Sequence, residues 1–269
     1  MVTDAIFLEK EKQLVVVGEW MSPVFLQVER GGFEKKTPKI VSENGEEKSI
    51  SGMWNCIEKV VDKESGKTDL LLGNMGTNSI WGNATPLELY VKDFDDNHQT
   101  DPIITYHRNG KKEVFTTRDN LTNQLSFFRK KFLTYQAFAE ASFEEIFTEE
   151  MLKNAIYKKV DNLNSIYLIQ NDNGSYLAEN MDFELQKFPI QDFATLRDEL
   201  LTFGNFYGNH PSIGKMDAGY GYSNKNRFSS YFGENGFVFK GDARRIAVLE
   251  SKRLVIVALN NGQTQIFGY

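Results

Sequence analysis

The sequence predicts a mostly β protein, and three observations support this prediction. Aromatic residues make up 13% of the chain, with 21 Phe and 11 Tyr, and such residues pack well on pleated sheets. Most apolar segments are short and are separated by charged or Gly-containing turns, as in β-rich folds. One order of elements also recurs: a strand, a charged turn, a short aliphatic strand and a glycine.

This recurring unit defines the order of the chain. In its first copy, residues 3–8 and 13–20 predict a hairpin around the charged turn 9–12, with a buried strand at Val15, Val16 and Val17. The five copies, of which the last is the weakest, cover residues 3–37, 52–76, 87–106 with a strand at 165–169, 188–208 and 237–267. Repeats of a four-stranded unit are typical of a β-propeller, in which each blade buries its faces against its neighbours. A β-sandwich is the rival interpretation, and the repeated aliphatic run before Gly favours the propeller.

A helical segment interrupts the β pattern at residues 116–160. Leu121, Leu125 and Phe128 follow a spacing of three to four residues, and Ser142 with Glu145 has the form of a capping box. We therefore expect one domain over residues 1–269, with short helices inserted between two strands of the third unit.

The loop of the third unit carries the strongest chemical signal. Oxygen-bearing side chains alternate at Asp93, Asp95, Asn97 and Gln99, and Asp101 closes the pattern. Carboxylates this close repel one another unless a cation lies between them. Oxygen donors suit a hard ion, and Ca²⁺ accepts six to eight of them. The pattern therefore predicts a Ca²⁺ site, while an acidic surface turn without an ion is the alternative, because Asp and Asn are common in turns.

The acidic loop is not an EF-hand. That motif requires Gly at its sixth position, Glu at its twelfth and a helix on each side. Here those positions are His98 and Ile104, and the flanking segments have strand patterns. We therefore expect the loop to lie in a β-hairpin.

Composition limits the possible partners. The formal net charge of −6 argues against nucleic acid or an anionic membrane as the main partner. No apolar run approaches the roughly 20 residues of a membrane span. The single cysteine, Cys56, rules out an intrachain disulfide and lies in a run typical of a core strand. The first residues have no secretory pattern, so the chain is either cytoplasmic or the end of a longer exported one.

The motifs together resemble the FG-GAP/VCBS repeat family of β-propellers, and more narrowly the large bacterial FG-GAP proteins of the ASPIC/UnbV and cartilage-acidic-protein group. The similarity covers almost the whole chain. The similar segments are VVVGEW at 15–20, LLLGNMGTNS at 70–79, YVKDFDDNHQTDPIITY at 90–106, GNFYG at 204–208 and KGDAR at 240–244.

The resemblance implies a ring of about four to five blades, which either closes alone or continues in further blades of a longer parent chain. It implies Ca²⁺ binding through the side chains of Asp93, Asp95, Asn97 and Asp101 and through the backbone carbonyl of Gln99. The other copies lack this ligand pattern, so we expect one calcium site. It also implies an exported repeat protein, at the cell surface or in the periplasm.

Three hypotheses for the function follow. The first is a non-catalytic binding or adhesion module that contacts a protein or a glycan. The second is a polysaccharide lyase or hydrolase, with His107, His210, Tyr207 and Arg118 as candidates, although no known catalytic spacing stands out. The third is a purely structural part of a surface protein.

An aromatic stretch near the end of the chain could serve a binding module. Tyr220, Tyr222 and Phe228 surround a Gly-Tyr-Gly turn. They either form a loop surface or pack between blades, and packing is the interpretation that the sequence favours.

Overall fold

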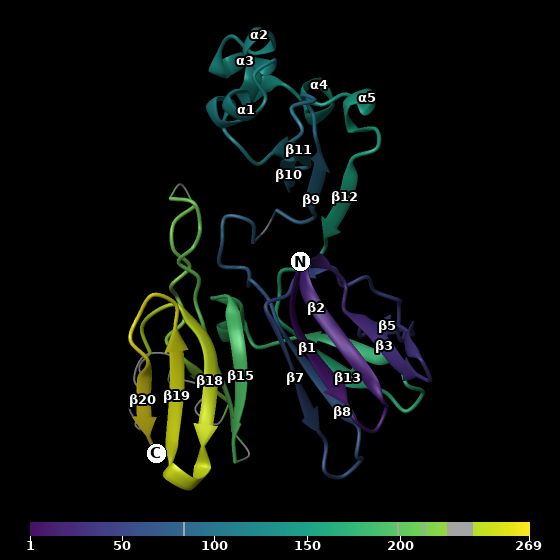
Figure 1. The fold of residues 1–269 in the computed structure, drawn as a ribbon, viewed down its shortest axis with the longest axis vertical. Helices are drawn as coiled ribbons and strands as arrows, with labels where there is room; N and C mark the ends of the chain where they lie inside the picture. Colours follow the sequence, from purple (N-terminus) through teal and green to yellow (C-terminus); the bar gives the residue numbers. More distant parts are fainter. Residues whose placement is uncertain (83, 198, 212, 225–238) are drawn as a thin grey trace. The chain divides into compact units, whose positions relative to one another are not determined.

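The computed structural model describes residues 1–82, 84–197, 199–211, 213–224 and 239–269. It confirms the mostly β class: these residues form several antiparallel sheets and only short helices (Figure 1). The chain divides into two compact units. Unit 1 comprises residues 1–82 and 162–269, and unit 2 comprises residues 83–161. Unit 2 is therefore an insertion in the chain of unit 1.

Sheet 1 of unit 1 is a meander of four consecutive strands. They are β1 (Val2–Leu8), β2 (Gln13–Met21), β3 (Val24–Glu29) and β4 (Gly32–Lys35), each antiparallel to the next. A short strand, β6 (Gly52–Met53), pairs with the end of β2. The turn between β1 and β2 falls at the predicted charged segment, 9–12.

Sheet 2 combines segments from both sides of the insertion. Its order is β5-β14-β13-β8-β7. The bounds are β5 (Ile40–Val41), β7 (Cys56–Val61), β8 (Thr68–Gly73), β13 (Ile166–Gln170) and β14 (Tyr176–Asn180). Strands β8 and β13 are antiparallel neighbours, although the whole of unit 2 lies between them in the chain.

Two three-stranded sheets complete the described part of unit 1. Sheet 3 contains β15 (Ile190–Leu196), β16 (Glu199–Gly204) and β17 (Tyr222–Ser223), and sheet 4 contains β18 (Ala243–Leu249), β19 (Leu254–Leu259) and β20 (Gln265–Gly268). Two 3₁₀ turns, η1 (Phe183–Gln186) and η2 (Glu250–Lys252), lie outside the sheets.

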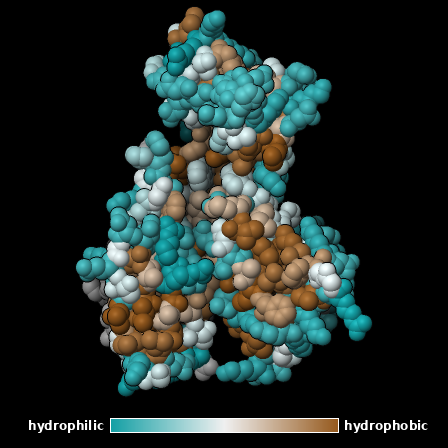
Figure 2. Space-filling model, in the orientation of Figure 1, coloured by the Kyte–Doolittle hydropathy of each residue, from teal (hydrophilic) through white to brown (hydrophobic). Residues whose placement is uncertain are grey.

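The four sheets of unit 1 pack face to face in chain order. The strands β1, β7, β15 and β18, which each begin the first hairpin of their sheet, are successive neighbours. A separate hydrophobic core fills each junction: Trp54 and Phe25 lie between sheets 1 and 2, Phe193 lies between sheets 2 and 3, and Phe203 lies between sheets 3 and 4. Cys56 is buried, as predicted, and burial raises the pKa of its thiol. Figure 2 shows further hydrophobic side chains at the surface, over β1–β3 and over β18–β20.

The same contacts recur at equivalent places in these sheets. Asp4 on β1 accepts a hydrogen bond from the backbone N–H of Ile57 on the next sheet, at 3.1 Å. Asp192 on β15 accepts one from the N–H of Ile246 on the next sheet, at 2.8 Å. Each aspartate follows a register shift in its first hairpin. Sheets 1 and 3 therefore join their successors through the same carboxylate–backbone contact.

Unit 2 is a four-stranded sheet with a cluster of helices. The sheet has the order β11-β10-β9-β12. Its strands are β9 (Leu87–Lys92), β10 (Asp101–Arg108), β11 (Lys111–Val114) and β12 (Ile156–Val160). The helices are α1 (Arg118–Gln124), α2 (Phe128–Lys131), α3 (Tyr135–Glu140), α4 (Phe143–Ile146) and α5 (Glu149–Leu152). Leu121, Leu125 and Phe128 lie in its core, and the predicted capping box is present at Ser142 and Glu145.

The structure differs from the sequence prediction in how it assigns the third unit. The strands predicted within 87–106 belong to the sheet of unit 2, whereas the strand predicted at 165–169 is β13 of sheet 2. The helical segment predicted for 116–160 ends earlier, because residues 156–160 pair with β9 as strand β12. Local alternation predicts a strand, but it does not specify which distant strand will pair with it.

Candidate functional site

The acidic loop joins β9 to β10 in an antiparallel hairpin, as expected. Lys92 and Asp101 are paired at its base. Carboxylate oxygens of Asp93, Asp95 and Asp101 all lie within 4.8 Å of one another. The structure therefore brings together the three carboxylates of the predicted ligand set.

Backbone N–H groups hold two of the loop's side chains in place. Asp93 accepts hydrogen bonds from the N–H of Asn97 at 3.1 Å and from that of His98 at 2.7 Å. Asn97 uses its side-chain oxygen to accept from the N–H of Gln99 at 2.7 Å. The loop therefore curls around the Asp93 carboxylate, and Asn97 and Gln99 lie on its exposed side.

Asp101 is the most buried member of the cluster. Its carboxylate accepts from the backbone N–H of Phe94 at 3.1 Å and from the side-chain amide of Gln124 on α1 at 3.2 Å. The α1 contact fixes the side of the loop that faces the helices. Gln124 was not a candidate from the sequence, because nothing in its local pattern distinguishes it from an ordinary helix-surface residue.

One carboxylate oxygen of the cluster is unsatisfied. Oδ1 of Asp95 is buried and has no hydrogen-bond partner among the described residues. Buried polar atoms are nearly always paired, and an unpaired one costs about 1–3 kcal/mol. A cation among the three carboxylates would satisfy this oxygen.

The protonation of Asp93 suits a cation site. Its desolvation acts to raise the pKa, but the backbone N–H groups of His98 and Asn97 outweigh it, and the pKa of Asp93 lies below its ordinary value. The carboxylate is therefore negatively charged at neutral pH.

The loop turns sharply at its sixth position, where an EF-hand has Gly. His98, at the sixth position, adopts φ of 68°, and Asp96 adopts φ of 56°. This left-handed conformation is unfavourable for a residue with a Cβ, although Asp and His adopt it more readily than most. The loop thus makes the same sharp turn without glycine.

A second polar cluster in unit 2 was not predicted. Glu88 on β9 is buried and forms an ion pair with Lys112 on β11. It also accepts hydrogen bonds from Tyr157 on β12 at 2.7 Å and from Thr105 on β10 at 3.1 Å. Side chains from the three other strands of the sheet therefore converge on one carboxylate, and only the strand pairing brings these residues together.

The environment of this ion pair favours the charged forms of both partners. Burial acts to raise the pKa of Glu88, but the bonds from Lys112 and Tyr157 outweigh it and the pKa is lowered. Burial acts to lower the pKa of Lys112, but Glu88 and Tyr90 outweigh it and the pKa is raised. The Lys112 ammonium also lies over the rings of Phe143 and Tyr90, 4.3 and 4.8 Å from their centroids, where cation–π attraction adds to the ion pair.

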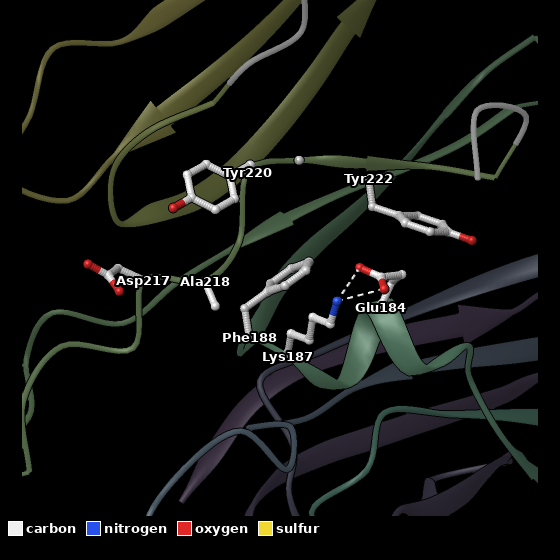
Figure 3. Close-up of a pocket in the computed structure, with 8 residues that line it drawn as sticks. Glu184, Lys187, Phe188, Asp217, Ala218, Tyr220 and Tyr222 are labelled. Carbon is white, nitrogen blue, oxygen red and sulfur yellow. Dashed lines mark hydrogen bonds and ion pairs between the residues drawn. The ribbon is translucent and has the colours of Figure 1, made fainter. Parts of the chain in front are cut away.

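Unit 1 contains a pocket of about 300 Å³ beside η1 and the start of β17. Its lining combines aromatic rings with charged groups and comprises Glu184, Lys187, Phe188, Asp217, Ala218, Tyr220, Gly221 and Tyr222. Figure 3 shows the rings of Tyr220, Phe188 and Tyr222 spread across the pocket, with the Lys187–Glu184 ion pair on one side. The pocket therefore offers apolar ring faces next to hydrogen-bonding groups.

Two of the three aromatic residues singled out in the sequence line this pocket. Tyr222 also donates a hydrogen bond from its hydroxyl to Asp182 at 3.0 Å. Phe228 lies outside the described residues, as do residues 237 and 238 of the fifth predicted copy.

The residues proposed for catalysis are divided between the two units. His107 and Arg118 belong to unit 2, and His210 and Tyr207 belong to unit 1. A ring nitrogen of His107 lies 3.1 Å from the carbonyl oxygen of Pro86. Arg118 donates to the carbonyl oxygen of Phe132 at 2.7 Å, which is a helix-stabilising contact.

Comparison with known proteins adds no family: no family model matches the chain, and no curated protein matches it. The resemblance to FG-GAP/VCBS repeats therefore remains a prediction from the motifs. Among the described residues, no helix is long and apolar enough to cross a membrane.

Proposed function

We propose that this chain is a non-catalytic binding module, stabilised by one Ca²⁺ ion and built on an FG-GAP-type β-propeller. The observation that carries the calcium part is the cluster of Asp93, Asp95 and Asp101 around the unsatisfied oxygen of Asp95. We propose further that the module belongs to an exported bacterial protein, at the cell surface or in the periplasm, where it serves adhesion.

The donor set favours calcium over other divalent ions. The cluster offers carboxylate oxygens, and the side chain of Asn97 and the carbonyl of Gln99 would complete the set. Thiolate and imidazole donors, which zinc prefers, are absent from the three clustered side chains. Mg²⁺ demands near-ideal octahedral geometry and keeps several waters, whereas Ca²⁺ tolerates an irregular oxygen cage.

The arrangement of unit 1 supports the propeller part. Its sheets are antiparallel meanders, apart from the parallel pairing of β5 with β14, and they pack face to face in chain order with β1, β7, β15 and β18 as successive neighbours. Equivalent aspartates, Asp4 and Asp192, join one sheet to the next. Such nearest-neighbour packing of repeated sheets is the design of a propeller. In this proposal sheets 1–4 are four blades, and unit 2 is inserted between β8 and β13 of the second blade.

Calcium is expected to stabilise unit 2. An ion that binds only the folded state raises the free energy of unfolding by RT ln(1 + [L]/Kd). This gain is about 2.7 kcal/mol when the free Ca²⁺ concentration is a hundred times Kd. Thermal unfolding and hydrogen exchange of β9 and β10 should be measured in Ca²⁺ and in EDTA. Asp95→Asn should abolish the difference, whereas Asp62→Asn, in an exposed turn of unit 1 where Asp62 accepts from Ser65, should preserve it. Identical unfolding in Ca²⁺ and EDTA would falsify the calcium part.

The ligand site is proposed to be the pocket of Figure 3, with a glycan as the ligand class that its lining fits best. Sugars stack their C–H faces on aromatic rings and hydrogen-bond to carboxylates, and Tyr220 and Asp217 provide both.

Binding to an immobilised panel of oligosaccharides is expected for the wild type and should fall at least tenfold in Tyr220→Ala. Tyr207→Ala, which removes a tyrosine of unit 1 outside the pocket, serves as the matched control. A wild-type protein that retains none of the panel, or a Tyr220→Ala variant that binds as well as the control, would count against the glycan ligand and leave a protein as the partner to seek.

A further inference from the structure

The two inner sheets of unit 1, sheets 2 and 3, each pack on both faces, one against the preceding sheet and one against the following sheet. Sheet 3 shows both. Phe193 and Leu200 pack in the core shared with sheet 2, and Leu201 and Phe203 pack in the core shared with sheet 4. Because side chains alternate along a strand, these sets lie on opposite faces. Among the described residues, no hydrophobic core includes the face of sheet 1 that points away from sheet 2 or the face of sheet 4 that points away from sheet 3.

Sheet 4 leaves the face that should meet a following sheet exposed. Its Val255 and Val257 are buried against sheet 3, so the alternate residues point away. These residues form the last-sheet face: Arg245, Ala247, Leu249, Leu254, Ile256, Ala258 and Ile266. All but Arg245 are apolar. Ala247 pairs with Ile256, and Ile256 pairs with Ile266, so the apolar surface is continuous across three strands.

Sheet 1 leaves the face that should meet a preceding sheet exposed. Val15 and Phe25 are buried against sheet 2, and the alternate residues point away. They form the first-sheet face: Ala5, Phe7, Leu14, Val16, Val24, Leu26, Val28, Phe33 and Lys35. All but Lys35 are apolar. Phe7, Leu14 and Leu26 are paired in a row across three strands.

Both faces carry large apolar side chains that are mostly exposed. Ile266 is 60% exposed on the last-sheet face, and Phe33 is 63% exposed on the first-sheet face. Figure 2 shows the two faces as brown areas on the same side of unit 1. Contiguous apolar surface of this kind marks an interaction site.

We propose that a second copy of this chain covers these surfaces, with the last-sheet face of one copy packed on the first-sheet face of the other. The two faces are matched halves of an interface that the chain already builds three times between its own sheets. Every copy carries one of each, which defines a head-to-tail contact. Since both faces lie on one side of unit 1, two copies can cover both at once and close the assembly.

The area sets the expected strength. From strand spacing and rise, three strands of six residues cover about 280 Å², so one contact buries about 560 Å² in total. A closed pair with two contacts buries about 1,100 Å², near the lower end of specific interfaces. Interfaces of this size are typical of weak association, so the molar mass is expected to depend on concentration.

The test is the molar mass of the full chain by light scattering between about 1 and 200 μM. The wild type is expected to rise toward two chains. Ile266→Asp, on the last-sheet face, and Phe33→Asp, on the first-sheet face, should each remain a single chain. An equimolar mixture of the two variants should associate again, because one intact pair of faces remains. Phe183→Asp, which changes a 73% exposed side chain outside both faces, should behave as the wild type.

Three results would overturn the proposal. One is a single-chain mass for the wild type at every concentration. Protection of both faces from hydrogen exchange in that single chain would show that the chain covers them itself. The second is loss of association in only one of the two face variants, which indicates like-on-like contact. The third is a mixture that stays monomeric while circular dichroism shows both variants folded.

Discussion

Replacing Asn74 by alanine is expected to lower the free energy of unfolding of unit 1 by about 3 kcal/mol, because an unpaired buried polar group costs about 1–3 kcal/mol. Asn74 is fully buried. Its side-chain oxygen accepts from the N–H groups of Met53 at 3.2 Å and Met75 at 2.8 Å. Its amide donates to the carbonyls of Asn162 at 3.0 Å and Asn164 at 3.2 Å. Alanine would leave these four backbone groups without that partner.

The measurement can be confined to unit 1. Trp20, Trp54 and Trp81 all lie in this unit, so tryptophan emission during urea unfolding reports it alone. Asn78→Ala is the matched control, because exposed Asn78 makes one bond, to the carbonyl of Lys187 at 3.1 Å, and should cost less than about 1 kcal/mol. Equal losses in the two variants would show that the Asn74 bonds do not hold the sheets.

Asn205 shows that this role is repeated. It follows Gly204 as Asn74 follows Gly73, it is buried, and its amide donates to the carbonyls of Gly219 and Gly241, both at 2.8 Å. Each asparagine thus holds the chain where it leaves the second strand of a sheet. In the sequence these Gly-Asn pairs predict only a turn. Their partners lie up to 90 residues away, and no local pattern specifies them.

The features that depend on neighbouring residues were predictable. The β1–β2 hairpin with its charged turn, the caps of the helices and the clustering of Asp93, Asp95 and Asp101 all arise within a few residues of chain. The strand at 165–169 was also recognised. Its pairing with β8 was not, because the alternation that predicts a strand is satisfied by any partner of suitable polarity.

The ion pair of Glu88 and Lys112 was missed for the same reason. In the sequence Glu88 lies between two leucines, and the alternation places it on the polar side of a half-exposed strand. The structure buries it under Tyr157 and Lys112 instead. A charged residue at an alternating position becomes buried only when other elements cover that face. Here Tyr157 of β12 and Phe143 of α4 cover the face that carries Glu88 and Lys112.

Replacing Glu88 by alanine is expected to destabilise unit 2 by about 3 kcal/mol, because removing one member of a buried pair leaves the other charge uncompensated. Lys112 would keep only the Tyr90 hydroxyl, at 2.6 Å, and the two aromatic rings. Hydrogen exchange of β9–β12 should show the loss, while tryptophan emission from unit 1 should not change. Glu113→Gln, on the same sheet and bonded to Tyr106 at 2.9 Å, is the control and should cost less than about 1 kcal/mol.

The pH dependence distinguishes a charge effect from lost packing. The pKa of Glu88 is lowered on folding, so its contribution is present above the unfolded pKa of about 4.3 and is lost as the pH falls through the folded value. The pKa of Lys112 is raised, so its contribution is present below the unfolded value of about 10.4 and is lost as the pH rises through the folded one. Glu88→Gln keeps the size of the side chain and removes its charge. Its unit 2 should therefore be less stable than the wild type at pH 7 and approach it in acid, whereas a constant difference across the pH range would mean that packing around Glu88 dominates.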